Sequence, residues 1–334
     1  MSIRVAINGF GRIGKHFLRY AVEKPEIEIV AINDLYDSKI LAHLLKYDSL
    51  HGKFPKQVYS EDDNLVVDGK FIKVLNEKDI TRLPWNELGI DIVLESSGCN
   101  KDRDILKGHL TSGAKKVVVS SPANDPDITI VLGVNTEAYN SREHHIISNA
   151  SCTTNCLAPL IKVVKENFGF VNGMMTTIHS YNQDQRLLDF PNKDYRRARA
   201  GALSMIPTTT GATNAVAKVI PEIEGKITGM SIRVPIPNVS LIDLVFKPET
   251  KDLSINDINS VFQKAAEGML RGILDISFEP LVSVDYLGNT FSSTVDALST
   301  EVCGDMVKII SWYDNESGYS KRLIELIALV GRLL

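Results

Sequence analysis

The residues best suited to chemistry lie in the stretch 148–156, where a hydroxyl-rich run delivers Cys152 to the start of an expected helix. A cysteine in a first helical turn lies near unpaired backbone N–H groups and the positive end of the helix dipole, and both favour the thiolate. Cys152 is therefore a candidate nucleophile, although a buried structural role is commoner for a free cysteine. Apolar residues then follow at helical spacing: Leu157, Leu160, Ile161, Val164 and Phe168.

Two other residues of this helix have different expected roles. Cys156 lies one turn beyond Cys152 on the apolar stripe, which suits a buried structural cysteine. Pro159 is expected to kink the helix or to confine its regular part to the residues that follow.

His179 is the second candidate catalytic residue. It ends the β-prone run 173–179 and precedes the polar run 180–185. A lone histidine is usually structural. Beside Cys152, however, its imidazole would hold the thiolate and take a proton from the hydroxyl formed when sulfur attacks a carbonyl.

Groups that suit a phosphate follow in the chain. They are the basic cluster 196–199, the run Pro207–Ala212 and Arg233 at a strand end. Short hydroxyl donors, a glycine and bidentate guanidinium groups are what phosphate requires. For the basic cluster, a solvated face or a subunit contact is an equally good interpretation. Nucleic acid is disfavoured as a partner, because the basic run is short and no aromatic platform accompanies it.

These groups require a cofactor-binding element, and the first 34 residues contain one. Gly9, Gly11 and Gly14 form G-x-G-x-x-G between a β-prone run and a helical pattern, so backbone can approach a pyrophosphate at a helix start. A second strand ends at Asp34, about 20 residues further on, where a carboxylate can bind ribose hydroxyls and disfavours a 2′-phosphate. Together these features predict binding of a dinucleotide.

Strand-like runs alternate with helical stretches through the first half, which predicts a mainly parallel, doubly wound sheet. Ligands of such sheets bind beyond the carboxyl ends of the strands. Ser97 and Ser120 follow two of these runs and are candidates to line the cofactor, with ordinary turn chemistry as the alternative. The runs are Ile3–Ile7, Glu28–Ile32, Leu65–Val67, Phe71–Leu75, Asp91–Glu95, Lys116–Val119 and Thr129–Leu132.

The second half predicts a separate domain. Long strand-like segments at 240–246 and 304–312 favour an α+β catalytic domain on a large mixed sheet, and Ser254 is the expected N-cap of a helix over 254–270. We expect a Rossmann-type domain over 1–150, completed by a C-terminal helix in 316–334, and a catalytic domain over 151–315.

Composition excludes several classes of protein. The 334 residues are 44% hydrophobic and 23% charged, with a net charge of −4, which is ordinary for a soluble globular chain and favours neither nucleic acid nor an anionic membrane. No signal peptide and no apolar run of membrane-spanning length is evident. Four cysteines form no disulfide framework, so a cytoplasmic location is expected. His144 and His145 lack further ligands at metal-site spacing, so no metal is expected.

Taken in order, these motifs resemble the phosphorylating glyceraldehyde-3-phosphate dehydrogenases along the whole chain. The motifs that carry the resemblance are 7–14, 148–159, 179–181, 207–212 and 311–319. The resemblance implies that Cys152 is the nucleophile, that His179 is its base, and that the enzyme is a homotetramer in which the loop 180–204 lies at a subunit interface. It implies cofactor contacts from Arg12, Ile13, Asp34, Lys78, Ser120 and Asn315, and contacts to substrate and inorganic phosphate from Ser151, Thr153, Asn182, Asp184, Arg197, Thr210, Gly211 and Arg233.

One departure leaves an alternative open. The family usually has threonine where this chain has Asn182, at a position that contacts phosphate. Asn182 gives some weight to erythrose-4-phosphate dehydrogenase, a relative that acts on a longer sugar aldehyde, whereas residues 208–211 favour the phosphorylating enzyme. Leu35 after Asp34, and Asp189-Phe190-Pro191, favour NAD over NADP. A non-catalytic dinucleotide-binding regulator or adhesin is the rival from another class, and the presence of Cys152 and His179 argues against it.

Overall fold

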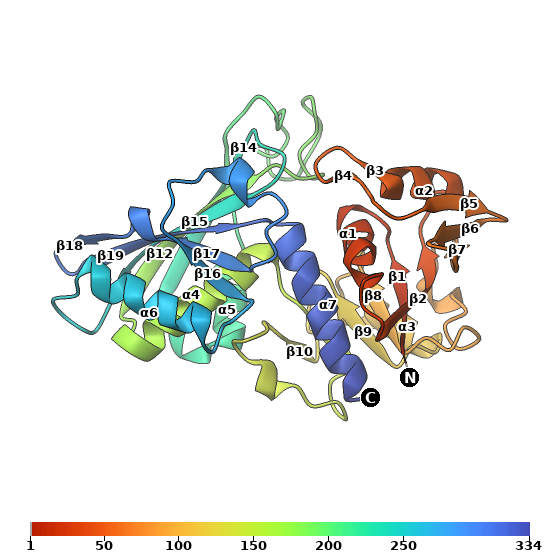
Figure 1. Ribbon diagram of the computed structural model, residues 1–334, viewed down its shortest axis with the longest axis horizontal. Helices are drawn as coiled ribbons and strands as arrows, with labels where there is room; N and C mark the ends of the chain where they lie inside the picture. Colours follow the sequence, from red (N-terminus) through yellow and green to blue (C-terminus); the bar gives the residue numbers. More distant parts are fainter. Residues whose placement is uncertain (1) are drawn as a thin grey trace. The chain divides into compact units, whose positions relative to one another are not determined.

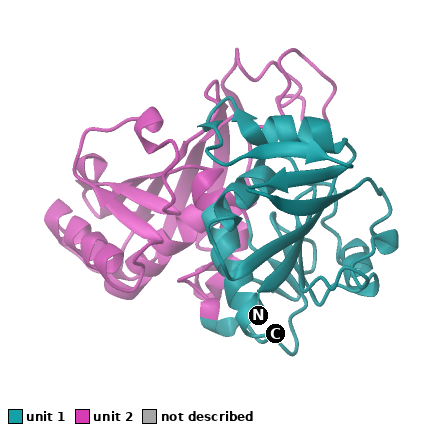
Figure 2. Ribbon diagram, turned by 45° about the vertical axis from the view of Figure 1, so that its right-hand side comes forward, with its two compact units in different colours: residues 1–130, 137–150, 320–334 teal, residues 131–136, 151–319 magenta. Residues whose placement is uncertain are grey.

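A computed structural model describes residues 2–334, and these divide into two compact units. Unit 1 comprises residues 2–130, 137–150 and 320–334, and unit 2 comprises residues 131–136 and 151–319 (Figure 2). Each unit is built on its own sheet.

The sheet of unit 1 has nine strands in the order β10-β11-β9-β8-β1-β2-β7-β6-β5 (Figure 1). All pairs from β10 to β7 are parallel, and β6 and β5 extend the sheet antiparallel. The order of strands reverses at β1, so the switch point lies between β1 and β8. The predicted doubly wound Rossmann-type sheet is confirmed.

The elements of unit 1 lie close to the predicted runs. The strands are β1 (Ile3–Asn8), β2 (Ile27–Asn33), β5 (Val58–Glu61), β6 (Asn64–Val67), β7 (Lys70–Leu75), β8 (Ile92–Glu95), β9 (Lys116–Val119), β10 (Ile128–Thr129) and β11 (Ile146–Ser148), with a small separate pair β3 (Tyr47–Asp48) and β4 (Gly52–Lys53). The helices are α1 (Arg12–Ala21), α2 (Ser38–Lys46) and α3 (Arg103–Thr111), with short 3₁₀ turns η1 (Ile80–Arg82) and η2 (Thr136–Ala138).

One predicted strand is largely wrong. Strand β10 contains only Thr129 of the predicted run at 129–132, together with the preceding Ile128. The end of the run does not join the sheet, because residues 131–136 belong to unit 2. The spacing of apolar residues predicts a buried segment, but it does not indicate which of the two units the segment packs in.

The sheet of unit 2 is mixed, as predicted, with the order β13-β14-β12-β15-β19-β17-β16 and β18 paired to β19. Its strands are β12 (Asn172–Ser180), β13 (Ile206–Thr209), β14 (Ile227–Val234), β15 (Ser240–Lys247), β16 (Leu274–Ser277), β17 (Ser293–Asp296), β18 (Glu301–Cys303) and β19 (Met306–Tyr313). The helices are α4 (Cys152–Phe168), α5 (Ala212–Val219) and α6 (Ile255–Glu267), with 3₁₀ turns η3 (Pro221–Ile223), η4 (Ser283–Tyr286) and η5 (Ala297–Ser299). Helix α7 (Ser317–Arg332) lies within the segment 316–334 in which a C-terminal helix is predicted, and its residues up to 319 belong to unit 2 and the rest to unit 1.

The two faces of this second sheet differ. Helices α4, α5 and α6 contact it (Figure 1). Along β15 the residues Ile242, Leu244 and Phe246 are fully buried. The alternate residues of the same strand are half-buried, because a strand points successive side chains to opposite faces. The second face therefore presents partly exposed apolar side chains.

Helix α4 runs without interruption from Cys152 to Phe168 with Pro159 inside it. The expectation that Pro159 confines the regular part to later residues is wrong. Proline removes one hydrogen bond to the carbonyl four residues earlier. The turns on both sides, including Cys156 and Leu160, are fully buried, so packing holds the helix together.

Helix α6 has the predicted N-cap. The Ser254 hydroxyl accepts the N–H of Asp257 at 3.2 Å, and the Asp257 carboxylate accepts the N–H of Ser254 at 2.9 Å, which completes a capping box. We expect Ser254→Ala to lower the free energy of unfolding by about 1 kcal/mol, measured by urea denaturation. A variant as stable as the wild type would show that the cap contributes nothing.

Among residues 2–334, no helix is long and apolar enough to cross a membrane.

Candidate functional site

The two predicted catalytic side chains meet within unit 2. Cys152 is the first residue of α4 and His179 lies near the end of β12, and Cys152 Sγ is 3.6 Å from His179 Nε2. His179 Nδ1 lies 2.7 Å from the backbone carbonyl of Ser180, which can only accept a hydrogen bond. Nδ1 therefore carries the proton, and Nε2 faces the sulfur as an acceptor.

The start of α4 places the sulfur. Ser151 is the N-cap, and its hydroxyl accepts the N–H of Thr154 at 3.1 Å. Ala150 precedes it with a φ of 53°, a left-handed conformation that a residue with a Cβ adopts at a cost of about 1 kcal/mol. This turn leads directly into the helix and leaves Cys152 partly exposed.

The electrostatic prediction for the free site needs correction. Burial raises the pKa of Cys152, and the positive charge of Arg233 and the backbone N–H of Thr153 only partly offset it. Burial, together with the charge of Arg233, also lowers the pKa of His179 to about 3. The substrate-free pair is therefore a thiol beside a neutral imidazole, and His179 takes the thiol proton as sulfur attacks.

The low pKa of His179 has a consequence for stability. Below pH 6.5 the histidine binds a proton in the unfolded chain, where its pKa is 6.5, but not in the folded protein, where its pKa is about 3. The free energy of unfolding therefore falls as the pH falls below 6.5. Between pH 6.5 and pH 5 we expect wild type to lose about 2 kcal/mol relative to His179→Asn. Urea denaturation of both proteins at the two pH values measures this. A difference independent of pH would contradict the buried neutral imidazole.

Arg233 is a half-buried cation without an acidic partner. It lies on β14 in register with His179 on the neighbouring parallel strand, and it donates to the carbonyl of Ser180 at 3.3 Å. Its Nε is buried and has no hydrogen-bond partner, and no carboxylate of residues 2–334 forms an ion pair with it. Burial lowers the pKa of Arg233. A half-buried guanidinium without a carboxylate partner suits an anionic ligand.

Arg197 stands in a different environment. It donates to the Asp184 carboxylate at 3.0 Å and to the Thr208 hydroxyl at 2.8 Å. Asn182 uses its Oδ1 to accept the N–H of Asp184 at 3.1 Å, which leaves its amide N–H₂ as the group available to a ligand. Arg197, Asp184 and Asn182 thus form one polar cluster.

Two other predicted phosphate residues lie at the start of α5. Gly211 is its N-cap, and Thr210 accepts the N–H of Ala212 through its hydroxyl at 3.2 Å. Thr153 is different, because its hydroxyl is buried and hydrogen-bonded to the Tyr313 hydroxyl at 2.9 Å. Thr153 therefore reaches a ligand only through its backbone.

Asn315 has a fixed amide orientation. Its Oδ1 accepts hydrogen bonds from the hydroxyls of Ser180 at 2.9 Å and Ser240 at 3.1 Å. The amide N–H₂ must then point away from both serines, as a donor for a carbonyl group.

Within unit 1, the glycine turn has the shape that a dinucleotide requires. Gly9 has a φ of 90°, and a Cβ placed there would lie 2.3 Å from Ser97 Cα. A Cβ on Gly14 would lie 2.4 Å from the carbonyl oxygen of Gly9, whereas the space beside Gly11 is open. No side chain caps α1 at Gly11, so the residues fit a pyrophosphate at this helix start.

The other predicted cofactor residues, apart from Asn315, also belong to unit 1. Asp34 follows β2 and accepts the N–H of Phe10 at 2.7 Å, and the N–H of Ser120 donates to the carbonyl of Glu95 at 2.9 Å. The Arg12 side chain is paired with Asp48 at 2.5 Å, so Arg12, like Ile13, offers its backbone to a phosphate. Lys78 is exposed in the turn after β7.

Comparison with known proteins bears on both units. Residues 3–103 match the family model for the NAD binding domain of glyceraldehyde 3-phosphate dehydrogenase, and residues 151–315 match the model for its C-terminal domain. The chain is 57% identical over 331 residues to a glyceraldehyde-3-phosphate dehydrogenase of Geobacillus stearothermophilus, covering 99% of this chain and 98% of the relative. The chain belongs to the glyceraldehyde-3-phosphate dehydrogenase family. Glyceraldehyde-3-phosphate dehydrogenase 1 of Bacillus subtilis is 55% identical over 333 residues, with 99% of each chain covered, and the enzyme of Mycolicibacterium smegmatis is 52% identical over 342 residues, with all of each chain covered.

Several supporting residues of this family member escape sequence reasoning. Tyr313 bridges the hydroxyls of Thr153 and Thr177, each at 2.9 Å, and so joins α4 to β12 beside the catalytic pair. Asp48 holds the Arg12 side chain, and Glu95 is fully buried at the end of β8. For Glu95 the sequence offers one signal, which is the position of a carboxylate at the end of an apolar, β-prone run. Tyr313 and Asp48 carry no comparable local signal.

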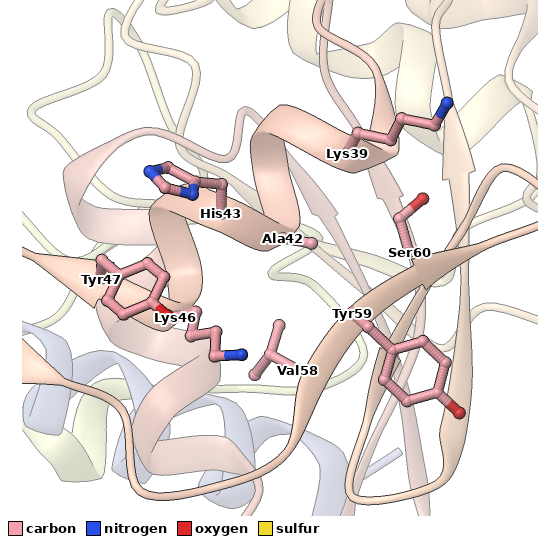
Figure 3. Close-up of a pocket in the computed structure, with 8 residues that line it drawn as sticks. All are labelled: Lys39, Ala42, His43, Lys46, Tyr47, Val58, Tyr59 and Ser60. Atoms are coloured by element: carbon pink, nitrogen blue, oxygen red, sulfur yellow. The ribbon is translucent and has the colours of Figure 1, made fainter.

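A hollow of about 310 Å³ in unit 1 lies apart from all these residues. It is lined by α2, the start of β3 and β5, and contains none of the predicted site residues (Figure 3). Its basic side chains are on an exposed helix face and reach no common point. Within residues 2–334, no group of three or more histidine, cysteine or acidic side chains could hold a metal ion.

Proposed function

We propose that the chain catalyses the NAD-dependent oxidative phosphorylation of D-glyceraldehyde 3-phosphate to 1,3-bisphosphoglycerate, a step of glycolysis and gluconeogenesis. The observation that carries this proposal is the Cys152–His179 pair at 3.6 Å with the unpaired Arg233 beside it. The names of the relatives and the NAD binding domain model support the substrate and the cofactor.

Cys152 acts as the nucleophile in the proposed reaction, and His179 transfers the protons. Cys152 Sγ attacks the aldehyde carbon while its proton passes to His179 Nε2, and the imidazolium returns that proton to the new alkoxide oxygen, which becomes the hydroxyl of the hemithioacetal. NAD supplies the hydride acceptor. His179 then takes the hydroxyl proton, so that a thioester to Cys152 forms as the carbon is oxidised. An oxygen of inorganic phosphate attacks the thioester, the C–S bond breaks, and Cys152 leaves as a thiolate.

Each remaining group has a binding role. Asn315 offers an N–H₂ donor with fixed orientation to the carboxamide of the cofactor. Arg233, Arg197, Asn182, Thr210 and Gly211 bind the phosphate groups of the substrate and of the inorganic phosphate. Ser151 fixes the start of α4 and Asp184 orients Arg197.

The experiment that tests this function measures NAD reduction with glyceraldehyde 3-phosphate and with erythrose 4-phosphate, each with and without inorganic phosphate. We expect the faster reaction with glyceraldehyde 3-phosphate and an absolute requirement for phosphate. Faster, phosphate-independent oxidation of erythrose 4-phosphate would establish the rival enzyme. No reduction with either aldehyde would leave only a dinucleotide-binding protein.

We propose a homotetramer as the working form. Two different apolar surfaces support it: the second face of the sheet in unit 2, with Met174 70% and Met230 40% exposed, and the loop 187–205, with Leu187 81% and Tyr195 87% exposed. A tetramer with two kinds of twofold contact would cover both. Analytical ultracentrifugation tests this, and a monomer at micromolar concentration would refute it. We propose the cytoplasm as the location, because exposed Cys99 and Cys303 are free thiols.

A further inference from the structure

Glu95 is a buried acid that the proposed chemistry does not use. It ends β8, next to the switch point of the sheet, and is 2% exposed. Five hydrogen bonds converge on its carboxylate. They come from Asn8 Nδ2 at 2.7 Å, Ser97 N at 2.8 Å, Ser97 Oγ at 2.6 Å, Asn100 Nδ2 at 3.0 Å and His109 Nε2 at 3.1 Å.

The direction of the bond from His109 is fixed from its other side. Trp85 Nε1 lies 3.0 Å from His109 Nδ1, and an indole can only donate. His109 Nδ1 is therefore the acceptor, and Nε2 carries the proton that points at Glu95. The imidazole is neutral, so this contact is a hydrogen bond to a carboxylate and not an ion pair.

The direction of the bond from Asn8 is fixed by a chain of amides. The backbone N–H of Glu77 donates to Asn33 Oδ1 at 2.9 Å, so Asn33 Nδ2 faces Asn8 Oδ1 at 2.7 Å. Asn8 must then turn its own N–H₂ toward Glu95. A flipped Asn33 would oppose the backbone N–H of Glu77, and a flipped Asn8 would oppose the N–H₂ of Asn33, so an oxygen of Glu95 is the last acceptor of this chain.

All five groups that reach the Glu95 carboxylate donate a hydrogen to it, and hydrogen bonds to the charged form of an acid favour that form. The carboxylate is thus a permanent acceptor at neutral pH. A glutamine would bring two amide hydrogens among donors that cannot reverse.

The two segments that Glu95 joins are in contact with one another. Asn8 immediately precedes Gly9, and a Cβ on Gly9 would lie 2.3 Å from Ser97 Cα. Ser96 Oγ donates to the carbonyl of Gly9 at 2.7 Å. The glycine turn and the loop 96–100 are therefore pressed together, and one carboxylate holds both.

We propose that Glu95 is a positioning residue for dinucleotide binding: by accepting from Asn8 and Ser97 together, it fixes the glycine turn and the loop 96–100 in the shape that receives the pyrophosphate of NAD. This inference rests on the dinucleotide site proposed above. It predicts that loss of the acceptor weakens NAD binding beyond any general loss of stability.

The test is calorimetric titration of the full-length protein with NAD, together with thermal unfolding without cofactor. Glu95→Gln is the main variant. Trp85→Phe is the matched control, because it damages the same network on the side away from the glycine turn. We expect Glu95→Gln to raise the Kd for NAD at least tenfold, and Trp85→Phe to leave it within twofold of wild type although it too unfolds at a lower temperature.

Two results would overturn the proposal. In one, Glu95→Gln binds NAD within twofold of wild type. In the other, both variants lose affinity in proportion to their loss of thermal stability, so that Glu95 is merely structural. Wild type that binds no NAD would instead refute the dinucleotide site itself, which is a distinguishable outcome.

A second variant covers the case in which Glu95→Gln does not fold. Asn100 is half-buried, and Asn100→Asp replaces a donor 3.0 Å from Glu95 by a like charge. We expect the Kd for NAD to rise several-fold. An unchanged Kd would overturn the proposal as well.

Discussion

Cys152→Ser is expected to lower kcat for the oxidative phosphorylation of glyceraldehyde 3-phosphate by at least about 10⁴-fold. A serine hydroxyl is far less acidic than a thiol, so His179, with a pKa of about 3, is too weak a base to activate it. An ester would also react far more slowly with phosphate than a thioester does. The measurement is steady-state NAD reduction at saturating substrate and phosphate.

The matched control is Cys303→Ser, which changes an exposed cysteine on β18 and should keep full activity. Cys152→Ser should also bind NAD and unfold like the wild type, because the substitution removes little volume. Near-normal turnover by Cys152→Ser would exclude Cys152 as the nucleophile.

His179→Asn is expected to lower kcat by about 10²–10⁴-fold, the usual contribution of a positioned general base. The thiol of Cys152 has a raised pKa, so without an acceptor at 3.6 Å it is rarely ionised at pH 7. Alkylation of Cys152 by iodoacetamide should slow in parallel, which reports the thiol directly and without substrate.

The control is His43→Asn, at an exposed histidine of α2, which should keep both rates. Loss of turnover with an unchanged rate of alkylation would mean that His179 acts only later in the reaction. Normal turnover would remove His179 from the mechanism.

Local patterns predicted the parts of the fold that local physics determines. G-x-G-x-x-G between a strand and a helix is such a pattern, because Gly9 and Gly14 are required by close contacts with the adjacent strand end and within the turn itself. Ser254 and the capping box of α6 are another. The start of α4 at Cys152 also followed from its own sequence.

The predictions were wrong where contacts between residues distant in the sequence determine the structure. The run at 129–132 divides between two units, and Pro159 remains helical because both flanking turns are buried. The predicted thiolate form of Cys152 was wrong for the same reason. The helix start favours a thiolate, but burial of the side chain in the folded unit raises the pKa of the thiol. Tyr313 joins Thr153 to Thr177 across sequence separations of 160 and 136 residues, which no motif encodes.

The bond from His179 Nδ1 to the carbonyl of Ser180 bears on how this site tolerates mutation. Every amino acid at position 180 supplies the same carbonyl, so the basic nitrogen stays turned toward the sulfur whichever side chain evolution places there. In sites where a carboxylate side chain orients the histidine, a single base change in the gene can disable the proton acceptor. Here a change of the Ser180 side chain would remove only the hydroxyl that donates to Asn315, so it would affect the proposed cofactor contact of Asn315 and leave the orientation of His179 unchanged.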